Sequence, residues 1–254
     1  NLYNYNYWSS PVGAINAVTN NNNYSVSGVF KDGTNPSNPI NINWIGGYNG
    51  IPGAPISLPR FWIYKFQNVS NSYANWTQAL GTGILSPAQG FTLKGSGAAG
   101  SSQNYTFIGK PYNGTITNPI AANNLNLSGN PYASAIDATA FINDNVSSTN
   151  GTLYFWEQYS TNNTHNLGQY QGGYATRNLT GGTVPVAPAL ISGLGSSTRI
   201  PGRFIPVGQG FFVKGNATGG NIVFKNSQRL FVKEDDANST IMFKNSNPVL
   251  GYVV

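Results

Sequence analysis

Pro87-Ala88-Gln89-Gly90-Phe91-Thr92-Leu93-Lys94-Gly95 is a segment that returns later in the chain as Val207-Gly208-Gln209-Gly210-Phe211-Phe212-Val213-Lys214-Gly215. The two copies lie 120 positions apart. In each copy, Gln-Gly opens a short run rich in aromatic and aliphatic residues, which is typical of a β-strand. We expect the Gly to permit a bulge or a positive φ, and the Gln side chain to satisfy backbone groups at the bend. The recurrence indicates an internal duplication.

Further matches occur in the same order along both halves. They pair Tyr7–Val12 with Leu127–Tyr132, Arg60–Tyr64 with Leu153–Trp156, and Tyr105–Lys110 with Ile222–Lys225. The duplication predicts a first repeat over residues 1–118 and a second over 123–254. The Pro-, Ala- and Asn-rich stretch 117–124 is the expected linker, and it is short enough that the two repeats should pack against each other.

Strand signals recur along the chain, and helical signals are nearly absent. The predicted strands are Tyr24–Phe30, Arg60–Phe66, Gly90–Lys94, Asn104–Gly109, Thr152–Tyr159, Gly210–Lys214, Asn221–Lys225, Leu230–Lys233 and Thr240–Lys244. Only Ala133–Asn143 has the spacing of a short helix, for which Asp137 is the expected cap. Many short strands bounded by Gly, Pro and Asn predict an all-β fold. We expect two tandem, diverged β-sandwich or jelly-roll-like repeats packed together.

The composition indicates where such a chain works. Charged residues make up only 8% of the sequence, against about 25% in an average soluble domain, whereas aromatic residues reach 13%. The chain has no Cys, which excludes disulfides, thiolate metal sites and Cys nucleophiles. A surface built of amides and hydroxyls is typical of secreted proteins, so we expect an extracellular or outer-cell-surface location. Asn1 stands where an initiator Met would, which suggests a piece of a longer precursor.

The charge pattern argues against two classes of partner. The net charge is +6, but no two of the thirteen Lys and Arg residues are adjacent. Nucleic-acid-binding surfaces usually carry clustered basic residues, so we expect no nucleic-acid partner. No apolar run approaches the length of a transmembrane helix, so we expect no membrane insertion.

A family resemblance rests on motifs of the second half. Leu127-Ser128-Gly129-Asn130-Pro131-Tyr132, then Gly151–Trp156, then Ile205–Lys214 and Val223–Arg229 resemble a module common in secreted proteins of Bacteroidetes. The first half resembles it in diluted form. Such modules stand before the C-terminal sorting domain of type IX secretion substrates, many of which are large surface adhesins. The resemblance implies location and architecture, and it does not specify a ligand.

Catalytic chemistry has little support in the sequence. There are seven acidic residues and one His, His165, which lies in a polar loop. A glycosidase needs two opposed carboxylates, and Asp137 or Asp144 with Glu157 is the combination to consider. Asp137 as a helix cap and Asp144 in an Asn-Asp-Asn turn are the simpler interpretations. We expect a non-enzymatic protein, with a polysaccharide hydrolase as the least favoured reading.

Calcium is the only cofactor for which the sequence offers candidates. Ca²⁺ binds carboxylate and amide oxygens, and Asp144, Asp235 and Asp236 lie in stretches rich in such groups. None of these stretches has the spacing of a defined calcium loop. One structural calcium ion therefore stays open as an alternative, and no other cofactor is expected.

Two loop clusters are the candidate ligand-binding residues. Trp44 and Tyr48 lie in an insertion at Gly33–Pro59, and Tyr170 and Tyr174 lie in an insertion at Asn162–Pro201. Both insertions combine aromatic rings with amides and glycines, the groups that bind sugars through ring faces and hydrogen bonds.

We therefore expect a non-catalytic cell-surface adhesin or binding module, with a glycan or another cell-surface polymer as its ligand. The alternative is a self-assembling subunit of a surface filament or stalk that binds copies of itself. In that case Asn1–Trp8 and Pro248–Val254, which look like unpaired strands, would add to sheet edges.

Overall fold

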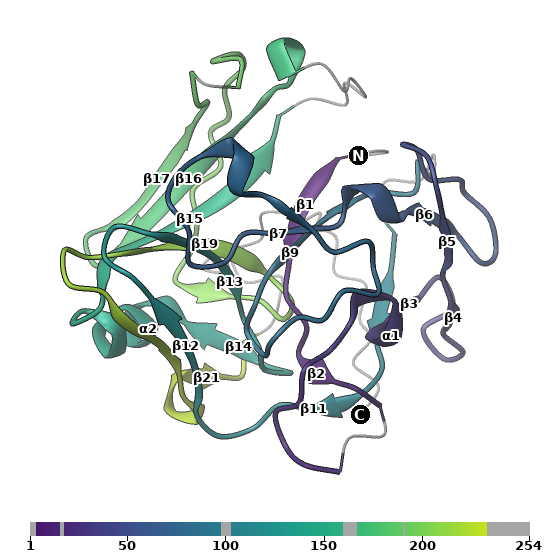
Figure 1. The fold of residues 1–254 in the computed structure, drawn as a ribbon, viewed down its shortest axis with the longest axis horizontal. Coiled ribbons are helices and arrows are strands. Elements are labelled where there is room, and N and C mark those ends of the chain that lie inside the picture. The colour runs from purple at the N-terminus through teal and green to yellow at the C-terminus, as the bar shows by residue number, and fades with distance from the viewer. Residues whose placement is uncertain (1–3, 16–17, 98–102, 160–166, 190, 233–254) are drawn as a thin grey trace.

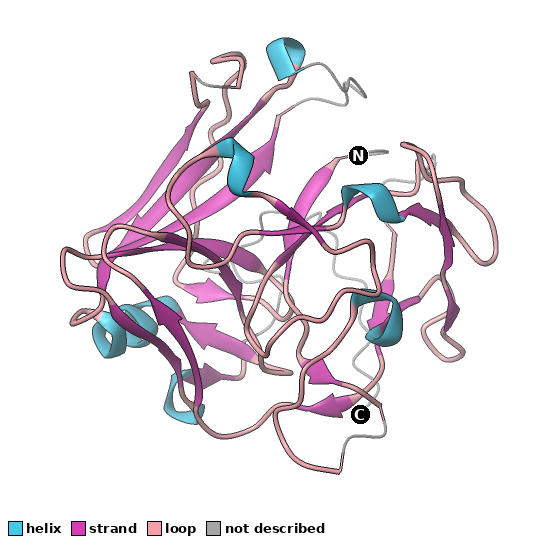
Figure 2. Ribbon diagram, viewed as in Figure 1, coloured by secondary structure: helices cyan, strands magenta, loops and turns pink. Residues whose placement is uncertain are grey.

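The computed structural model describes residues 4–15, 18–97, 103–159, 167–189 and 191–232. The chain is mostly β, with several antiparallel sheets (Figures 1 and 2). The helices in these ranges are short: α1 (Val26–Val29), α2 (Ala138–Asn145), and the 3-10 turns η1 (Arg60–Trp62), η2 (Tyr73–Asn75), η3 (Leu167–Gln169) and η4 (Asn226–Gln228). None of them is long and apolar enough to cross a membrane.

One sheet of five strands is larger than the others in the described ranges. Its order is β13 (Leu125–Gly129), β19 (Gly210–Gly215), β15 (Thr149–Gln158), β16 (Gly172–Asn178) and β17 (Gly181–Val186). The three-stranded sheets are β10 (Tyr105–Phe107), β3 (Phe30–Asp32) and β4 (Ile40–Asn41), and β18 (Phe204–Ile205), β14 (Ala135–Asp137) and β21 (Arg229–Leu230). The antiparallel pairs are β1 (Tyr5–Trp8) with β9 (Phe91–Lys94), β2 (Val12–Gly13) with β11 (Lys110–Pro111), β7 (Tyr64–Lys65) with β8 (Thr77–Gln78), and β12 (Ile116–Ile120) with β20 (Gly220–Phe224). The pair β5 (Asn43–Ile45) and β6 (Ser57–Pro59) is parallel.

The two Gln-Gly segments occupy matching places in this arrangement. β9 pairs with β1 and β19 pairs with β13, both antiparallel. Phe91 lies opposite Trp8 and Phe211 lies opposite Ser128, so both members of the pair shift by 120 positions. The same shift holds along the whole of β1 and β9.

The two strand pairs also bond to each other, at a contact that we call the junction. Ser9 N donates to Gly208 O (2.9 Å), and Gly129 N donates to Ala88 O (3.1 Å). Isolated bridges join Trp8 to Gln209 and Gln89 to Ser128. Each contact is the counterpart of another after a shift of 120 positions. Backbone pairing therefore runs from β1 to β9, β13 and β19, and back to β1.

The junction explains the Gln-Gly motif, and it corrects part of the expectation. Positive φ values occur one residue before the Gln, at Ala88 (63°) and Gly208 (74°), and not at the glycine that follows it. Gln89 Oε1 accepts a hydrogen bond from Ser86 N (3.1 Å), as expected for a Gln that satisfies the bend. Gly90 is needed because the other copy approaches closely. A Cβ on this residue would lie 2.8 Å from Ser128 O.

Both halves contribute to one main hydrophobic core. Phe91, Leu93, Phe211 and Val213 are all buried in it, together with residues from most of the described chain. The predicted linker is also structured, because residues 116–120 form β12, which pairs with β20 of the second half.

Two predicted strands begin as helical turns. Tyr24–Phe30 contains α1, whose Val26 and Val29 bury one side of a single turn. Arg60–Phe66 starts as η1 and becomes β7 only at Tyr64. Short apolar runs do not distinguish a strand from a buried turn by sequence alone. The predicted strand Thr240–Lys244 lies outside the described residues.

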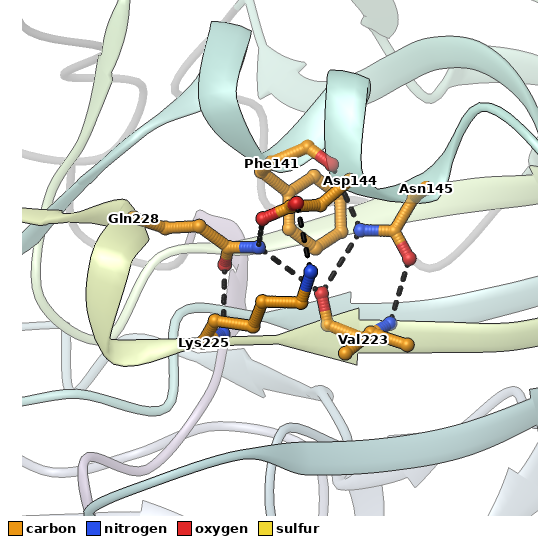
Figure 3. Close-up of polar contacts among 6 residues, drawn as sticks. All are labelled: Phe141, Asp144, Asn145, Val223, Lys225 and Gln228. Atoms are coloured by element: carbon orange, nitrogen blue, oxygen red, sulfur yellow. Dashed lines mark hydrogen bonds and ion pairs between the residues drawn. The ribbon is translucent and has the colours of Figure 1, made fainter.

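The one predicted helix forms, displaced toward the C-terminus as α2. Asp137 caps it, because its side chain accepts a hydrogen bond from Thr139 N (2.9 Å). At the other end, Asn145 is fully buried, and its side-chain amide forms hydrogen bonds with both the N–H and the carbonyl group of Val223 in β20 (Figure 3). Asp144 was expected in a turn, but it lies in the last turn of this helix.

Candidate binding surface

A row of aromatic rings joins the two loop clusters that the sequence singles out. The ring of Tyr48 lies 5.6 Å from that of Trp62, Trp62 lies 5.4 Å from Tyr5, and Tyr5 lies 5.7 Å from Tyr170, measured between ring centroids. Tyr5 meets both neighbours edge to face, an arrangement that the ring quadrupoles favour. The row therefore links an early loop with one more than 100 residues later, through β1 and η1.

Two more tyrosines extend the row. The phenol groups of Tyr73 and Tyr64 lie near enough to that of Tyr5 to raise its pKa, and those of Tyr73 and Tyr48 raise the pKa of Tyr64. Burial, followed by these neighbours, raises the pKa of Tyr5 well above its ordinary value. We call this set the tyrosine patch and define it as Tyr5, Tyr48, Trp62, Tyr64, Tyr73 and Tyr170. Its elements lie in the upper half of Figure 1.

The patch is accessible at its surface and supported from below. Tyr48 is 53% exposed and Tyr73 is 67% exposed, whereas its other members are half-buried. Beneath them lies a second apolar cluster that contains Tyr7, Phe66, Leu127, Trp156 and Phe212. The rings of Trp156 and Tyr170 stack at 5.8 Å with an interplanar angle of 13°. The patch is therefore built on a packed base.

Simple sequence features place these rings. In β1, alternation sends Tyr5 and Tyr7 to the same face. Gly172 lies against Trp156, and a Cβ at this position would come within 2.3 Å of the indole ring. Thr92 fixes η1 and β7 beside the patch, because its Oγ1 donates to Trp62 O (2.6 Å) and accepts from Tyr64 N (2.9 Å).

Two of the four residues that we expected from the sequence to contact a ligand lie in the patch, and two do not. Tyr48 and Tyr170 belong to the patch. Tyr174 lies beneath it, and its hydroxyl shares a hydrogen bond of 2.8 Å with that of Tyr7. Trp44 lies in β5 and packs against the main core.

Four patch residues were not proposed as ligand contacts from the sequence. Trp62 lies in an aromatic segment that the second half repeats, a pattern that favours a place in the core, and Tyr64 and Tyr73 carry no signal of their own. Tyr5 did carry one. The alternation of Asn and Tyr over residues 3–7 places tyrosines on one strand face, and such a tyrosine-rich face is unusual in a core.

Each of the three carboxylates considered for catalysis pairs with a different cation. Asp137 pairs with Arg203 (2.6 Å), Asp144 with Lys225 (2.8 Å), and Glu157 lies 3.6 Å from Arg199. Burial raises the pKa of Asp137, but hydrogen bonds from the Arg203 side chain and from Thr139 N outweigh it, so the net pKa is lowered. The hydrogen bond from Lys225 lowers the pKa of Asp144. These two groups stay ionised at neutral pH.

The calcium candidates have different outcomes. The two carboxylate oxygens of Asp144 accept hydrogen bonds from Lys225 Nζ and Gln228 Nε2, each at 2.8 Å (Figure 3). Asp235 and Asp236 lie outside the described residues. Within the described ranges, no three His, Cys, Asp or Glu side chains gather in a way that could hold a metal ion.

Lys94 lies at the edge of the patch. Because its pKa is lowered, we expect the stability of the protein to depend on pH in an unusual way. The residue is 2% exposed, and burial lowers the pKa of its ammonium group from 10.5 to about 8. Between these values the unfolded chain binds more protons than the folded chain, so the free energy of unfolding should rise with pH. The expected total gain is up to about 3 kcal/mol.

Urea unfolding of the chain and of Lys94→Met between pH 7.5 and 9.5 measures this effect. The wild type should gain stability across that range, and the variant should not. Equal slopes for the two proteins would show that Lys94 keeps an ordinary pKa.

Comparison with known proteins identifies a family whose description states no function. Comparisons with curated proteins and with solved structures give no significant match. A family model described as a domain of unknown function (DUF8693) matches residues 53–249, which include most of the patch and both Gln-Gly segments. The chain therefore belongs to the DUF8693 family.

Proposed function

We propose that this chain is a non-catalytic, extracellular binding module that recognises glycans through the tyrosine patch. The observation that carries the proposal is the row of partly exposed rings that joins loops from the two halves. Tyrosine offers a large, rigid contact area and a hydroxyl at its rim, which suits ligands with both C–H faces and hydroxyl groups. The extracellular, cell-surface location rests on the composition and on the resemblance to secreted Bacteroidetes modules.

We also propose that the fold is a diverged duplication, with tandem sandwich-like repeats at residues 1–118 and 123–254. The equal registers of β1–β9 and β13–β19 support it. In this comparison Tyr5 and Tyr7 correspond to Leu125 and Leu127 of the second copy. An aliphatic residue therefore occupies the same position in the second strand pair, so packing does not require a tyrosine there, and the half-buried Tyr5 of the first copy is available for a ligand.

Self-assembly into a filament or stalk is the second candidate. Among the described strands, β17 is one of the two outer strands of the large sheet, and its Val184 and Val186 are 42% and 71% exposed. However, Pro185 within this strand lacks an N–H, and the pairing of β16 with β17 is irregular between Tyr174 and Thr176. Both features discourage the addition of another strand. We therefore rank self-assembly below glycan binding, and a hydrolase lower still.

Removing exposed rings of the patch should weaken glycan binding and leave the fold intact. Tyr48→Ala and Tyr73→Ala should each weaken binding roughly tenfold, as expected when an aromatic contact is lost from a binding surface. Tyr5→Leu introduces the residue that the second copy carries, so it should also weaken binding without lowering the melting temperature. Calorimetric titration with cellohexaose, xylohexaose and chitohexaose measures the affinities.

Phe231→Ala is the control, because Phe231 is 94% exposed and is not part of the patch. Wild-type affinity for the patch variants would place the ligand elsewhere. Failure of the wild type to bind any of these hexasaccharides would count against the proposed ligand class. Filaments of the purified wild type under the electron microscope would favour self-assembly.

A further inference from the structure

Lys94 occupies a buried place under one end of the tyrosine patch. It ends β9 directly opposite Tyr5 of β1, and its ammonium nitrogen lies 5.4 Å from the ring centroid of Trp62. The residue is 2% exposed, although lysine is rarely buried to this extent. A buried ammonium group costs free energy, so its contacts call for an explanation beyond packing.

Those contacts hold the loop that carries Tyr48. Lys94 Nζ donates to Tyr48 O (3.3 Å) and to Asn49 Oδ1 (3.1 Å). The same carbonyl of Tyr48 accepts a hydrogen bond from Trp62 Nε1 (2.7 Å). The carbonyl group of Tyr48 therefore connects its loop to the indole ring of Trp62 and to the buried ammonium group of Lys94.

The loop needs such ties because its ends are glycines. Gly46 and Gly47 precede Tyr48, and Gly47 has a φ of +81°. Gly50 follows, pressed against the backbone of Ser57 and Ser96, where a Cβ would lie 2.6–2.7 Å from backbone atoms. Glycine gives a chain more conformational freedom than any other residue. The position of the exposed Tyr48 ring therefore depends on the hydrogen bonds to its own carbonyl and to Asn49.

We propose that Lys94 is a positioning residue of the tyrosine patch, which holds the Tyr48 loop and Trp62 in the geometry that binds ligand. The inference rests on the proposed function of the patch. The second copy provides a comparison, because Lys214 lies opposite Leu125 in the equivalent register and is only half-buried. Both copies therefore carry a lysine at this position of the strand. The hydrogen bonds to the Tyr48 loop are made by Lys94 of the first copy.

The charge of Lys94 gives the proposal a signature in pH. Because the pKa of Lys94 is lowered to about 8, its ammonium group loses its proton between pH 7 and 9, and its hydrogen bonds lose their charge assistance. Its neighbours are Tyr5, which lies opposite it on β1, and Tyr48 on the loop that it holds, and burial raises the pKa of Tyr5 and of Tyr64 on β7. Tyr5 and Tyr64 therefore stay neutral over this range.

The experiment compares the wild type with Lys94→Met and with the matched control Lys214→Met. Hydrogen exchange of the amides of residues 46–50 reports the loop without any ligand, and cellohexaose titration at pH 7 and pH 9 reports the patch. In Lys94→Met, loop exchange should rise about tenfold and affinity should fall about tenfold. Lys214→Met should change neither. Wild-type affinity should fall at pH 9, and that of Lys94→Met should be the same at both pH values.

The outcomes separate this inference from the proposed function. Unchanged loop exchange in Lys94→Met would overturn the positioning role, whether or not a glycan binds. Faster loop exchange with no cellohexaose binding by the wild type would support the positioning role and count against this glycan as the ligand. Equal loss of affinity in Lys94→Met and Lys214→Met would reduce the effect to general destabilisation and overturn the inference.

Discussion

Gly210→Ala should destabilise the protein by about 3 kcal/mol or more, a loss large enough to unfold many domains of ordinary stability. A Cβ at Gly210 would lie 2.7 Å from Tyr7 C, 2.8 Å from Trp8 N and 2.9 Å from Trp8 O. All three atoms are backbone atoms of β1, which is held by its own pairing and cannot move aside. The methyl group would therefore force the two copies apart at the junction.

The equivalent change in the other copy tests the same contact from the opposite side. Gly90→Ala should have a similar effect, because a Cβ there would meet Leu127 Cγ and Ser128 O, both at 2.8 Å. Gly46→Ala is the control, since nothing lies within 4 Å of its Cβ position. Urea midpoints measure all three variants. A Gly210→Ala protein with the wild-type midpoint would mean that the close approach at the junction is not a feature of the folded protein.

Asn145→Leu is the second change with a large expected effect, about 3 kcal/mol of lost stability. Asn145 is fully buried, and its side-chain amide pairs with the backbone of β20 as a neighbouring strand would. Its Nδ2 donates to Val223 O (2.9 Å) and to Phe141 O (2.8 Å), and its Oδ1 accepts from Val223 N (2.7 Å), as Figure 3 shows. Leucine has a similar volume, but it would leave these backbone groups inside the protein with fewer partners.

Two companion variants make the interpretation specific. Asn143→Leu changes an exposed residue of the same helix and should alter the unfolding midpoint little. Asn145→Asp keeps the shape but places a carboxylate against two carbonyl oxygens, so it should destabilise strongly at pH 7 and less at pH 4. A variant Asn145→Leu as stable as Asn143→Leu would show that the amide does not hold α2 to β20.

Much of the strand content could be predicted because local pattern and burial agree. β9 and β10 lie within predicted runs, β15, β19 and β20 overlap them, and Asp137 caps α2 as its position suggested. The failures come from tertiary contacts. Residues 117–120 belong to the stretch that looks like a linker because of its Pro and Asn, yet they form a strand because β20 provides a partner. No local rule identifies such a partner in advance.

The patch was harder to predict than the strands for a related reason. Tyr48 and Tyr170 stood out because they lie in loops rich in glycine and amides. The residue that links them, Trp62, looked like core because its segment is repeated. A strand pattern gives the face of each side chain, but it does not tell which faces from distant parts of the chain meet. Tyr5 and Trp62 approach only because β1 and η1 both pack beside β9.

The junction has a kinetic consequence during synthesis. The hydrogen bond between Ser9 and Gly208 joins residues that lie far apart in the sequence, and β1 completes its pairing only when β19 is present. Contacts between residues so far apart in sequence are slow to form, because the intervening chain must first be ordered. The N-terminal half therefore cannot reach its final state as it leaves the ribosome, unlike a domain that folds as soon as it emerges. Until β19 has been made, β1 therefore has β9 as a partner but lacks its contact with the second copy.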